Sequence, residues 1–242
     1  MSSIKVLYED NHIIAVVKPA GVLTQGDRTG ERSLMDDVRD YLMEKKNKTA
    51  GNVFLGLVHR LDKPVQGIVL FGKTSKGASR LSEQFRNHSI QKTYHAIVVG
   101  KLKESKGEIK EKVNKISFFA EGFTNKTDEE LLAEIKKATK TRTAELSWEA
   151  VKSNDKFSLL KILPKTGRFH QIRIQMANMG HPILGDTKYG GQTHRPISES
   201  VWKDRNSIAL AATAISFKSA TEDKIINLEI PLPEEWAKLS TP

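Results

Sequence analysis

The sequence has no cysteine among its 242 residues, which excludes disulfide bridges and thiolate zinc sites. It also has no apolar run long enough to span a bilayer. Its first residues, MSSIKVLYEDNHIIAVVKP, carry neither the apolar region nor the cleavage site of a signal peptide. We therefore expect a cytoplasmic protein that makes no membrane contact and is stabilised by its core alone.

Acidic residues are fewer than basic ones, 29 against 39, and the formal net charge is +10. A surplus of this size makes a polyanion such as RNA the expected partner. Charge alone does not settle the matter, because many basic proteins bind no nucleic acid.

Short β-rich segments bounded by turn residues alternate with a few amphipathic helices. The predicted strands cover residues 4–10, 12–19, 52–59, 67–73, 92–102, 144–152, 157–164, 207–217 and 224–231. The predicted helices cover residues 33–47, 75–88, 127–138 and 167–180, with capping boxes at Ser33/Asp36 and Thr127/Glu130. This order indicates one α+β domain over residues 1–242, with a large antiparallel or mixed sheet.

Residues 101–141 form a lysine-rich interval, which we interpret as an excursion from the core. The first half, KLKESKGEIKEKVNK, interleaves glutamates among its lysines, so its positive charge density is moderate. A solvated charged face is one interpretation, and part of an RNA-binding surface is the other.

Two chemical patterns overlap in LVHRLDKPVQGIVLFGKT, residues 57–74. The segment from Gly67 to Thr74 fits the phosphate-loop pattern G-x-x-x-x-G-K-[ST]. However, the residues between its glycines are Ile, Val, Leu and Phe, which favour a buried strand and resist the backbone angles of a phosphate-binding loop. We therefore expect a strand here, with nucleotide binding as the minor alternative.

The first half of the same stretch places Asp62 just before a Lys-Pro step. If residues 57–62 are extended, Arg60 and Asp62 lie on one face, and Pro64 ends the strand so that Asp62 stands at the mouth of the sheet. Taken alone, this stretch favours an ordinary turn residue at Asp62.

A second, distant stretch changes this balance: KTGRFHQIRIQMANMGHPILGDTKYG, residues 165–190. This stretch contains the motifs GRFHQIR and HPILGD. They follow three earlier motifs along the chain: VVKPAGVLTQ, HRLDKPVQGIVLFGKT and QKTYHAIV. Motifs of this kind in this order resemble those that mark RNA pseudouridine synthases of the large-subunit ribosomal type A family. The chain resembles that family over nearly its whole length. It departs from the family pattern at Gln66 and Gln175, which lie beside the expected catalytic positions.

The resemblance implies a mixed, mostly antiparallel sheet with flanking helices and a central cleft. It implies the conversion of uridine to pseudouridine in ribosomal or transfer RNA, without metal or cofactor. Asp62 is then the catalytic carboxylate, Arg173 its ion-pair partner and Tyr94 the residue beside the target base. The same resemblance places Arg60 where the flipped base leaves the stack.

Further residues are expected to bind substrate: Leu184, which is equally compatible with the core, and Arg168 and His170 of GRFHQIR. His59, His170 and His181 lack the spacing of metal ligands, so we interpret them as structural or hydrogen-bonding. We expect a monomer that binds RNA through the catalytic domain itself, since no accessory RNA-binding module precedes it. A non-catalytic RNA-binding protein is the main alternative.

Overall fold

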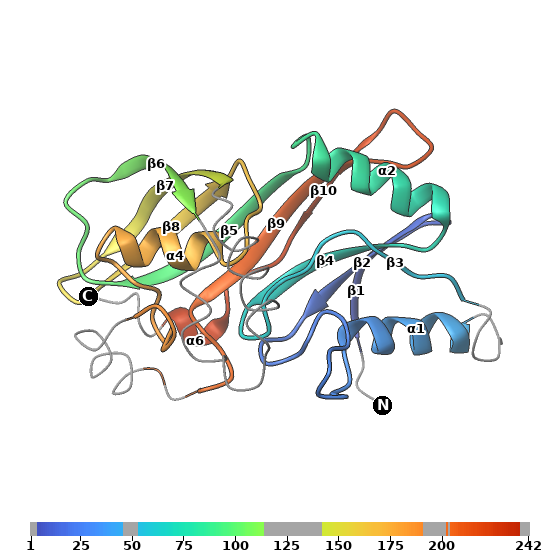
Figure 1. The fold of residues 1–242 in the computed structure, drawn as a ribbon, viewed down its shortest axis with the longest axis horizontal. Coiled ribbons are helices and arrows are strands. Elements are labelled where there is room, and N and C mark those ends of the chain that lie inside the picture. The colour runs from blue at the N-terminus through green and yellow to red at the C-terminus, as the bar shows by residue number, and fades with distance from the viewer. Residues whose placement is uncertain (1–3, 46–52, 114–141, 191–201, 203, 238–242) are drawn as a thin grey trace, which may run out of the picture.

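The computed structural model describes residues 4–45, 53–113, 142–190, 202 and 204–237. These residues form an α+β domain around one ten-stranded sheet, as the sequence predicts (Figure 1). The strand order is β1-β2-β4-β9-β5-β8-β7-β6, with β10 paired to β9 and β3 paired to β4. In the described part of the chain no helix is both long and apolar enough to cross a membrane.

The strands are β1 Lys5–Glu9, β2 Ile13–Lys18, β3 Gly56–Leu57, β4 Gln66–Gly72, β5 Gln91–Val99, β6 Lys106–Val113, β7 Arg142–Ser153, β8 Phe157–Pro164, β9 Leu210–Lys218 and β10 Ile225–Glu229. The helices are α1 Leu34–Lys45, α2 Ser75–Arg86, α4 Gln171–Asn178 and α6 Glu234–Ala237. Before α1, the Asp36 carboxylate accepts hydrogen bonds from the backbone N–H and hydroxyl of Ser33, so these residues make the predicted cap.

Two apolar clusters cover the two faces of the sheet. One contains Leu81 of α2 packed on β2, β4 and β9. The other is larger and includes Leu34 and Val38 of α1 together with Ile172 and Met176 of α4. Helices α1 and α4 are far apart in sequence, so the sheet brings the two halves of the chain to one core.

The two halves of the sheet join through β4 and β9, which are the only parallel neighbours among the strand pairs that the structure describes. Gly67 lies at this junction with a φ of 136°, and a Cβ atom there would overlap the backbone of Ala212. Glycine is therefore needed at this point for both reasons. Because Gly67 lies so close to Ala212 of β9, the start of β4 and the loop before it lie at the centre of the sheet.

The phosphate-loop alternative is wrong. Residues 66–72 form the buried strand β4, and the Lys73 Nζ atom is paired with Glu9 Oε1 at 2.5 Å and with the Asp10 carbonyl at 2.6 Å. Thr74 accepts the N–H of Gly77 and caps α2. Both polar residues of the motif are thus engaged in structural contacts.

Two other expectations are corrected. The predicted strand over residues 52–59 contracts to β3, and residues 58–62 pass to β4 without strand pairing. The interval 101–141 is not wholly an excursion, because β6 pairs with β7 along eight positions as the edge of the sheet. Its exposed lysines alternate with inward-facing residues, which is a common way to protect a sheet edge. The predicted helix 127–138 lies outside the described residues.

Lys73→Ala should lower the free energy of unfolding by about 1–3 kcal/mol, because Glu9 loses one of its buried partners. RNA-modifying activity should stay within a few-fold of the parent, and ATP should give no thermal shift. Lys76→Ala removes the same charge from an exposed position of α2 and should change neither quantity. Saturable ATP binding that disappears in Lys73→Ala would restore the phosphate-loop interpretation.

Candidate active site

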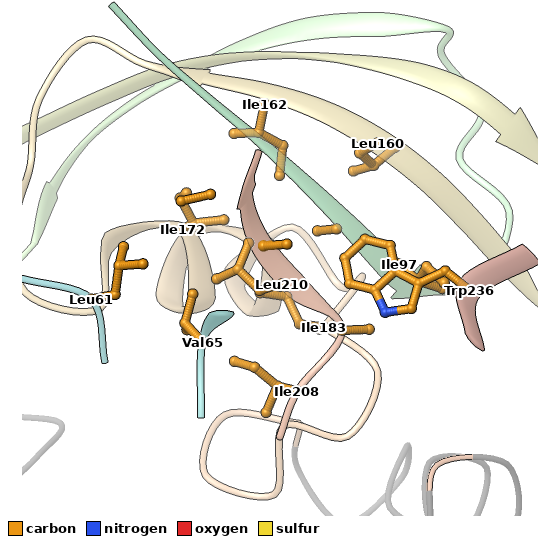
Figure 2. Close-up of a cluster of buried hydrophobic side chains, with 14 of the residues drawn as sticks. Leu61, Val65, Ile97, Leu160, Ile162, Ile172, Ile183, Ile208, Leu210 and Trp236 are labelled. Atoms are coloured by element: carbon orange, nitrogen blue, oxygen red, sulfur yellow. The ribbon is translucent and has the colours of Figure 1, made fainter. Parts of the chain in front are cut away.

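The loop between β3 and β4 holds Asp62 at the border of the core. Its neighbours Leu61 and Val65 are 6% and 2% exposed, and Figure 2 shows them gathered with Ile172 of α4 and Leu210 of β9. The Asp62 side chain is 26% exposed. Because Leu61 and Val65 are buried, the Asp62 carboxylate between them is only partly accessible to water.

A second segment, from Lys18 to Thr24, forms hydrogen bonds with the backbone of this loop. The Thr24 hydroxyl donates to the Leu61 carbonyl at 2.8 Å and lies 3.2 Å from the Leu61 N–H, which donates to it. The fully buried Lys18 Nζ donates to the carbonyl of Lys63 and to two carbonyls of its own segment. Burial lowers the pKa of Lys18 to about 7. In the sequence, Lys18 stands out only as part of the VVKPAGVLTQ motif. The structure shows that its ammonium group binds the Lys63 carbonyl in the loop that carries Asp62.

Arg173 of α4 is held mainly by Asp186, a partner that the sequence analysis missed. Nε and Nη2 of Arg173 donate to the two carboxylate oxygens of Asp186 at 2.6 and 2.8 Å, and both side chains are buried. Burial alone would lower the pKa of Arg173, but the hydrogen bonds and charge of Asp186 outweigh it and raise the pKa. This bidentate geometry fixes the guanidinium plane and leaves Nη1 directed elsewhere.

The third guanidinium nitrogen of this arginine, Nη1, faces Asp62. Nη1 of Arg173 lies 3.5 Å from Oδ2 of Asp62, and Nε2 of His170 lies 3.3 Å from the same oxygen. The pair expected from the sequence is present, but it is longer than the pair with Asp186. Burial raises the pKa of Asp62 by more than Arg173 and Arg60 lower it.

A pocket opens beside Asp62. It is lined by Arg60, Leu61, Asp62, Val65, Lys92, Tyr94, Pro164, Thr166, Gly167, Arg168, His170, Gln171, Ile172, Arg173 and Leu210. Burial, followed by the charge of Asp62, raises the pKa of Tyr94, so its hydroxyl is neutral at physiological pH. The structure thus brings six of the seven residues that the sequence singles out to one pocket.

Leu184 is the exception. It is fully buried in the core and does not line the pocket. Conversely, Lys92 lines the pocket although the sequence analysis did not select it. It stands two residues before Tyr94 in QKTY, and that proximity to an expected site residue was the only available signal.

The three histidines differ in their surroundings. Nε2 of His59 accepts the Leu70 N–H at 2.9 Å, and Nδ1 of His181 lies 2.9 Å from the Val99 carbonyl, so both bind backbone groups. His170 belongs to the pocket. Within the described ranges, no group of three or more His, Asp or Glu side chains is arranged to hold a metal ion.

The family model and two relatives that this chain matches are all described as pseudouridine synthases. The family model described as RNA pseudouridylate synthase matches residues 12–178. A protein of Vibrio cholerae named tRNA pseudouridine synthase C is 31% identical over 98% of this chain and 94% of its own length. A protein of Rickettsia bellii named ribosomal large subunit pseudouridine synthase C is 33% identical over 96% of this chain and 70% of its own length.

A solved structure shows the same fold. Human RNA pseudouridylate synthase domain containing 4 superposes with a TM-score of 0.73 at 22% identity, covering 96% of this chain and 90% of that one. The two chains therefore share their overall fold.

Arg173→Leu should lower the free energy of unfolding by roughly 3 to 5 kcal/mol, because it leaves a buried carboxylate without its cation. Adding Asp186→Asn should recover much of this loss, whereas adding Asp62→Asn should recover little, since the Asp62 contact is longer and more exposed. Urea unfolding of the single and double variants gives both coupling energies. A larger recovery with Asp62→Asn would show that Asp62 is the main partner.

The raised pKa of Asp62 also predicts a pH dependence of stability. At pH values between the ordinary and the raised pKa, the folded protein binds more protons than the unfolded chain. The contribution of protonated Asp62 to the free energy of unfolding is therefore lost as the pH rises through the raised pKa. Asparagine does not titrate. The free energy of unfolding of Asp62→Asn relative to the parent should therefore increase between about pH 4 and pH 7. Urea titrations at the two pH values that gave the opposite trend would contradict this assignment.

Proposed function

Since the chain belongs to the RNA pseudouridylate synthase family and isomerises uridine to pseudouridine in RNA, we propose that Asp62 is the carboxylate that attacks the target nucleotide. The observation that carries this proposal is the position of Asp62. Its carboxylate lies in the pocket, partly withdrawn from water, with a fixed guanidinium 3.5 Å away. Such a carboxylate is accessible to a ligand and has its negative charge stabilised when ionised.

The isomerisation requires no other reactant. The bond between C1′ of the ribose and N1 of uracil breaks, the base turns, and a bond forms between C1′ and C5. The proton lost from C5 is balanced by the proton gained at N1. Asp62 attacks the sugar or the base to open this sequence, and either route regenerates the free carboxylate at the end.

The other pocket residues bind and orient the nucleotide. We propose that the Tyr94 ring lies against the target base, since it lines the pocket and its neutral hydroxyl is under the influence of Asp62. Arg60 is exposed at the pocket, where a planar cation can occupy the space that the flipped base leaves in the RNA. Arg168 offers a second cation at the rim. Leu184, which lies in the core, contributes packing.

The substrate is proposed to be structured RNA, either transfer or ribosomal. The named relatives act on one or the other, and a net charge of +10 suits a phosphate backbone in both cases. We further propose that the enzyme acts in the cytoplasm as a monomer, without metal or cofactor.

Asp62→Asn should reduce pseudouridine formation by roughly a thousandfold or more, because the amide keeps the shape of the side chain but removes its nucleophilic charge. RNA affinity should stay similar or rise slightly, since one negative charge leaves a basic surface. The assay is site-resolved pseudouridine mapping of total RNA from cells lacking the gene, after incubation with each purified protein.

Asp155→Asn is a matched control, because it makes the same change at a side chain that is 97% exposed. It should leave the mapping pattern unchanged. Near-parent activity of Asp62→Asn would contradict the role of this aspartate. A parent protein that binds RNA but forms no pseudouridine would favour the non-catalytic alternative.

A further inference from the structure

The two carboxylate oxygens of Asp62 have different surroundings. Nη1 of Arg173 and Nε2 of His170 both approach Oδ2, at 3.5 and 3.3 Å. Among the residues that the structure describes, no hydrogen bond or ion pair reaches Oδ1. Oδ2 is thus the anchored oxygen, and Oδ1 is the one available to a nucleotide.

His170 is held in an unusual position. It is the N-cap residue of α4 and has a φ of 50° and a ψ of 27°, in the left-handed region that residues other than glycine seldom adopt. Its ring stacks on Phe169 at 3.8 Å between centroids. Nδ1 lies 2.8 Å from the Tyr189 hydroxyl. A strained backbone that presents one ring to several partners is typical of a functional position.

The contacts of His170 define which of its nitrogens carries the proton. Burial and then the charge of Arg173 lower the pKa of His170 to about 3, so the ring is neutral and has a single N–H. Nη1 of Arg173 lies 3.5 Å from Nδ1 of His170 and can only donate a hydrogen bond. The Tyr189 hydroxyl lies 2.8 Å from the same nitrogen. Nδ1 is therefore the acceptor, and Nε2 carries the hydrogen that faces Oδ2 of Asp62.

We propose that Tyr189 and His170 are positioning residues: the Tyr189 hydroxyl hydrogen-bonds Nδ1 of neutral His170, and Nε2 of that ring, 3.3 Å from Oδ2, holds the Asp62 carboxylate in its reactive orientation. The proposal rests on the function proposed above for Asp62. His170 was expected from the sequence to bind substrate, and this assignment gives it a different task. The Tyr189 hydroxyl acts on Asp62 through His170.

The same loop that carries Tyr189 supports this arrangement. Oδ1 of Asp186 accepts the N–H groups of Lys188 and Tyr189 at 3.1 and 3.2 Å, so the residue that holds Arg173 also shapes the turn that presents Tyr189. The Tyr189 ring lies 5.0 Å from the guanidinium carbon of Arg173. The ring packs on the cation while its hydroxyl orients the imidazole.

The charged and titratable groups around Asp62 come from every element packed against it, and they set its ionisation together. They are Arg60 of its own loop, Lys18 of β2, Tyr94 of β5, His170 and Arg173 at the start of α4, and Asp186 and Tyr189 of the loop that follows. Of these, His170 is the neutral group whose ring nitrogen lies 3.3 Å from Oδ2. Turning its N–H group away from Oδ2 should therefore raise the pKa of Asp62 while the charges stay in place.

The experiment compares Tyr189→Phe with the parent enzyme. Phenylalanine keeps the ring over Arg173 but removes the hydroxyl from Nδ1, which leaves the longer contact of Arg173 Nη1 as the remaining donor there, so the hydrogen on the imidazole is confined less strongly to Nε2. We expect kcat to fall about tenfold with KM within about twofold, and the acid limb of the kcat/KM profile to move to higher pH. Tyr8→Phe, which removes a hydroxyl bound to Asp10 outside the pocket, should change neither kcat nor the profile.

His170→Gln provides the second arm. The glutamine amide can donate to Oδ2 of Asp62 without depending on Tyr189, so Tyr189→Phe should have almost no further effect on kcat or the profile in this background. An equal effect of Tyr189→Phe in both backgrounds would overturn the proposal. So would a parent-like acid limb and kcat in the single variant.

The third arm needs no RNA. Long-range ¹H–¹⁵N spectra of the parent should show His170 neutral, with the hydrogen on Nε2, and Tyr189→Phe should increase the share of the Nδ1–H form. A parent ring protonated at Nδ1 would overturn the proposal. If Asp62→Asn remained active, the proposed function would fail, whereas the imidazole spectra would still report on the contact between Tyr189 and His170 by itself.

Discussion

The bidentate pair between Arg173 and Asp186 is the interaction on which the rest of the site depends. It neutralises a buried guanidinium and sets the plane in which Nη1 reaches Asp62. Asp186 also accepts two backbone N–H groups and so shapes the turn that carries Tyr189. One buried ion pair therefore orients the cation, the following loop and, through them, the surroundings of the carboxylate.

Asp62 is kept at the edge of the core by contacts that do not involve its own side chain. Leu61 and Val65 are buried beside it, while Thr24 and Lys18 bind the loop backbone. The carboxylate is thereby held in a partly dry position that disfavours its charge, as the raised pKa shows. A position that is unfavourable for stability makes the group accessible and poised for reaction, which is a common compromise at active sites.

The stretch from residue 57 to 74 shows why a short pattern must be tested against its neighbours. Its phosphate-loop match fails because Gly67 and Gly72 bound a buried strand, and Gly67 serves the close approach of β4 to Ala212. Lys73 binds Glu9 instead of a phosphate. The aspartate of the same stretch looked like an ordinary turn residue, and only its combination with the distant GRFHQIR motif pointed to chemistry.

The sequence by itself determined the α+β class, the strands with apolar cores such as β4 and β9, and the cap at Ser33, because these follow from local periodicity and hydrogen bonding. Its spaced motifs also indicated Asp62 and the family. Only the tertiary structure decided that Arg173 binds Asp186 more closely than Asp62, that β6 completes the sheet, and that Leu184 lies in the core. Both carboxylates were eligible partners along the chain. Distance and burial choose between them, and these quantities arise only when segments more than a hundred residues apart are brought together by the packed sheet.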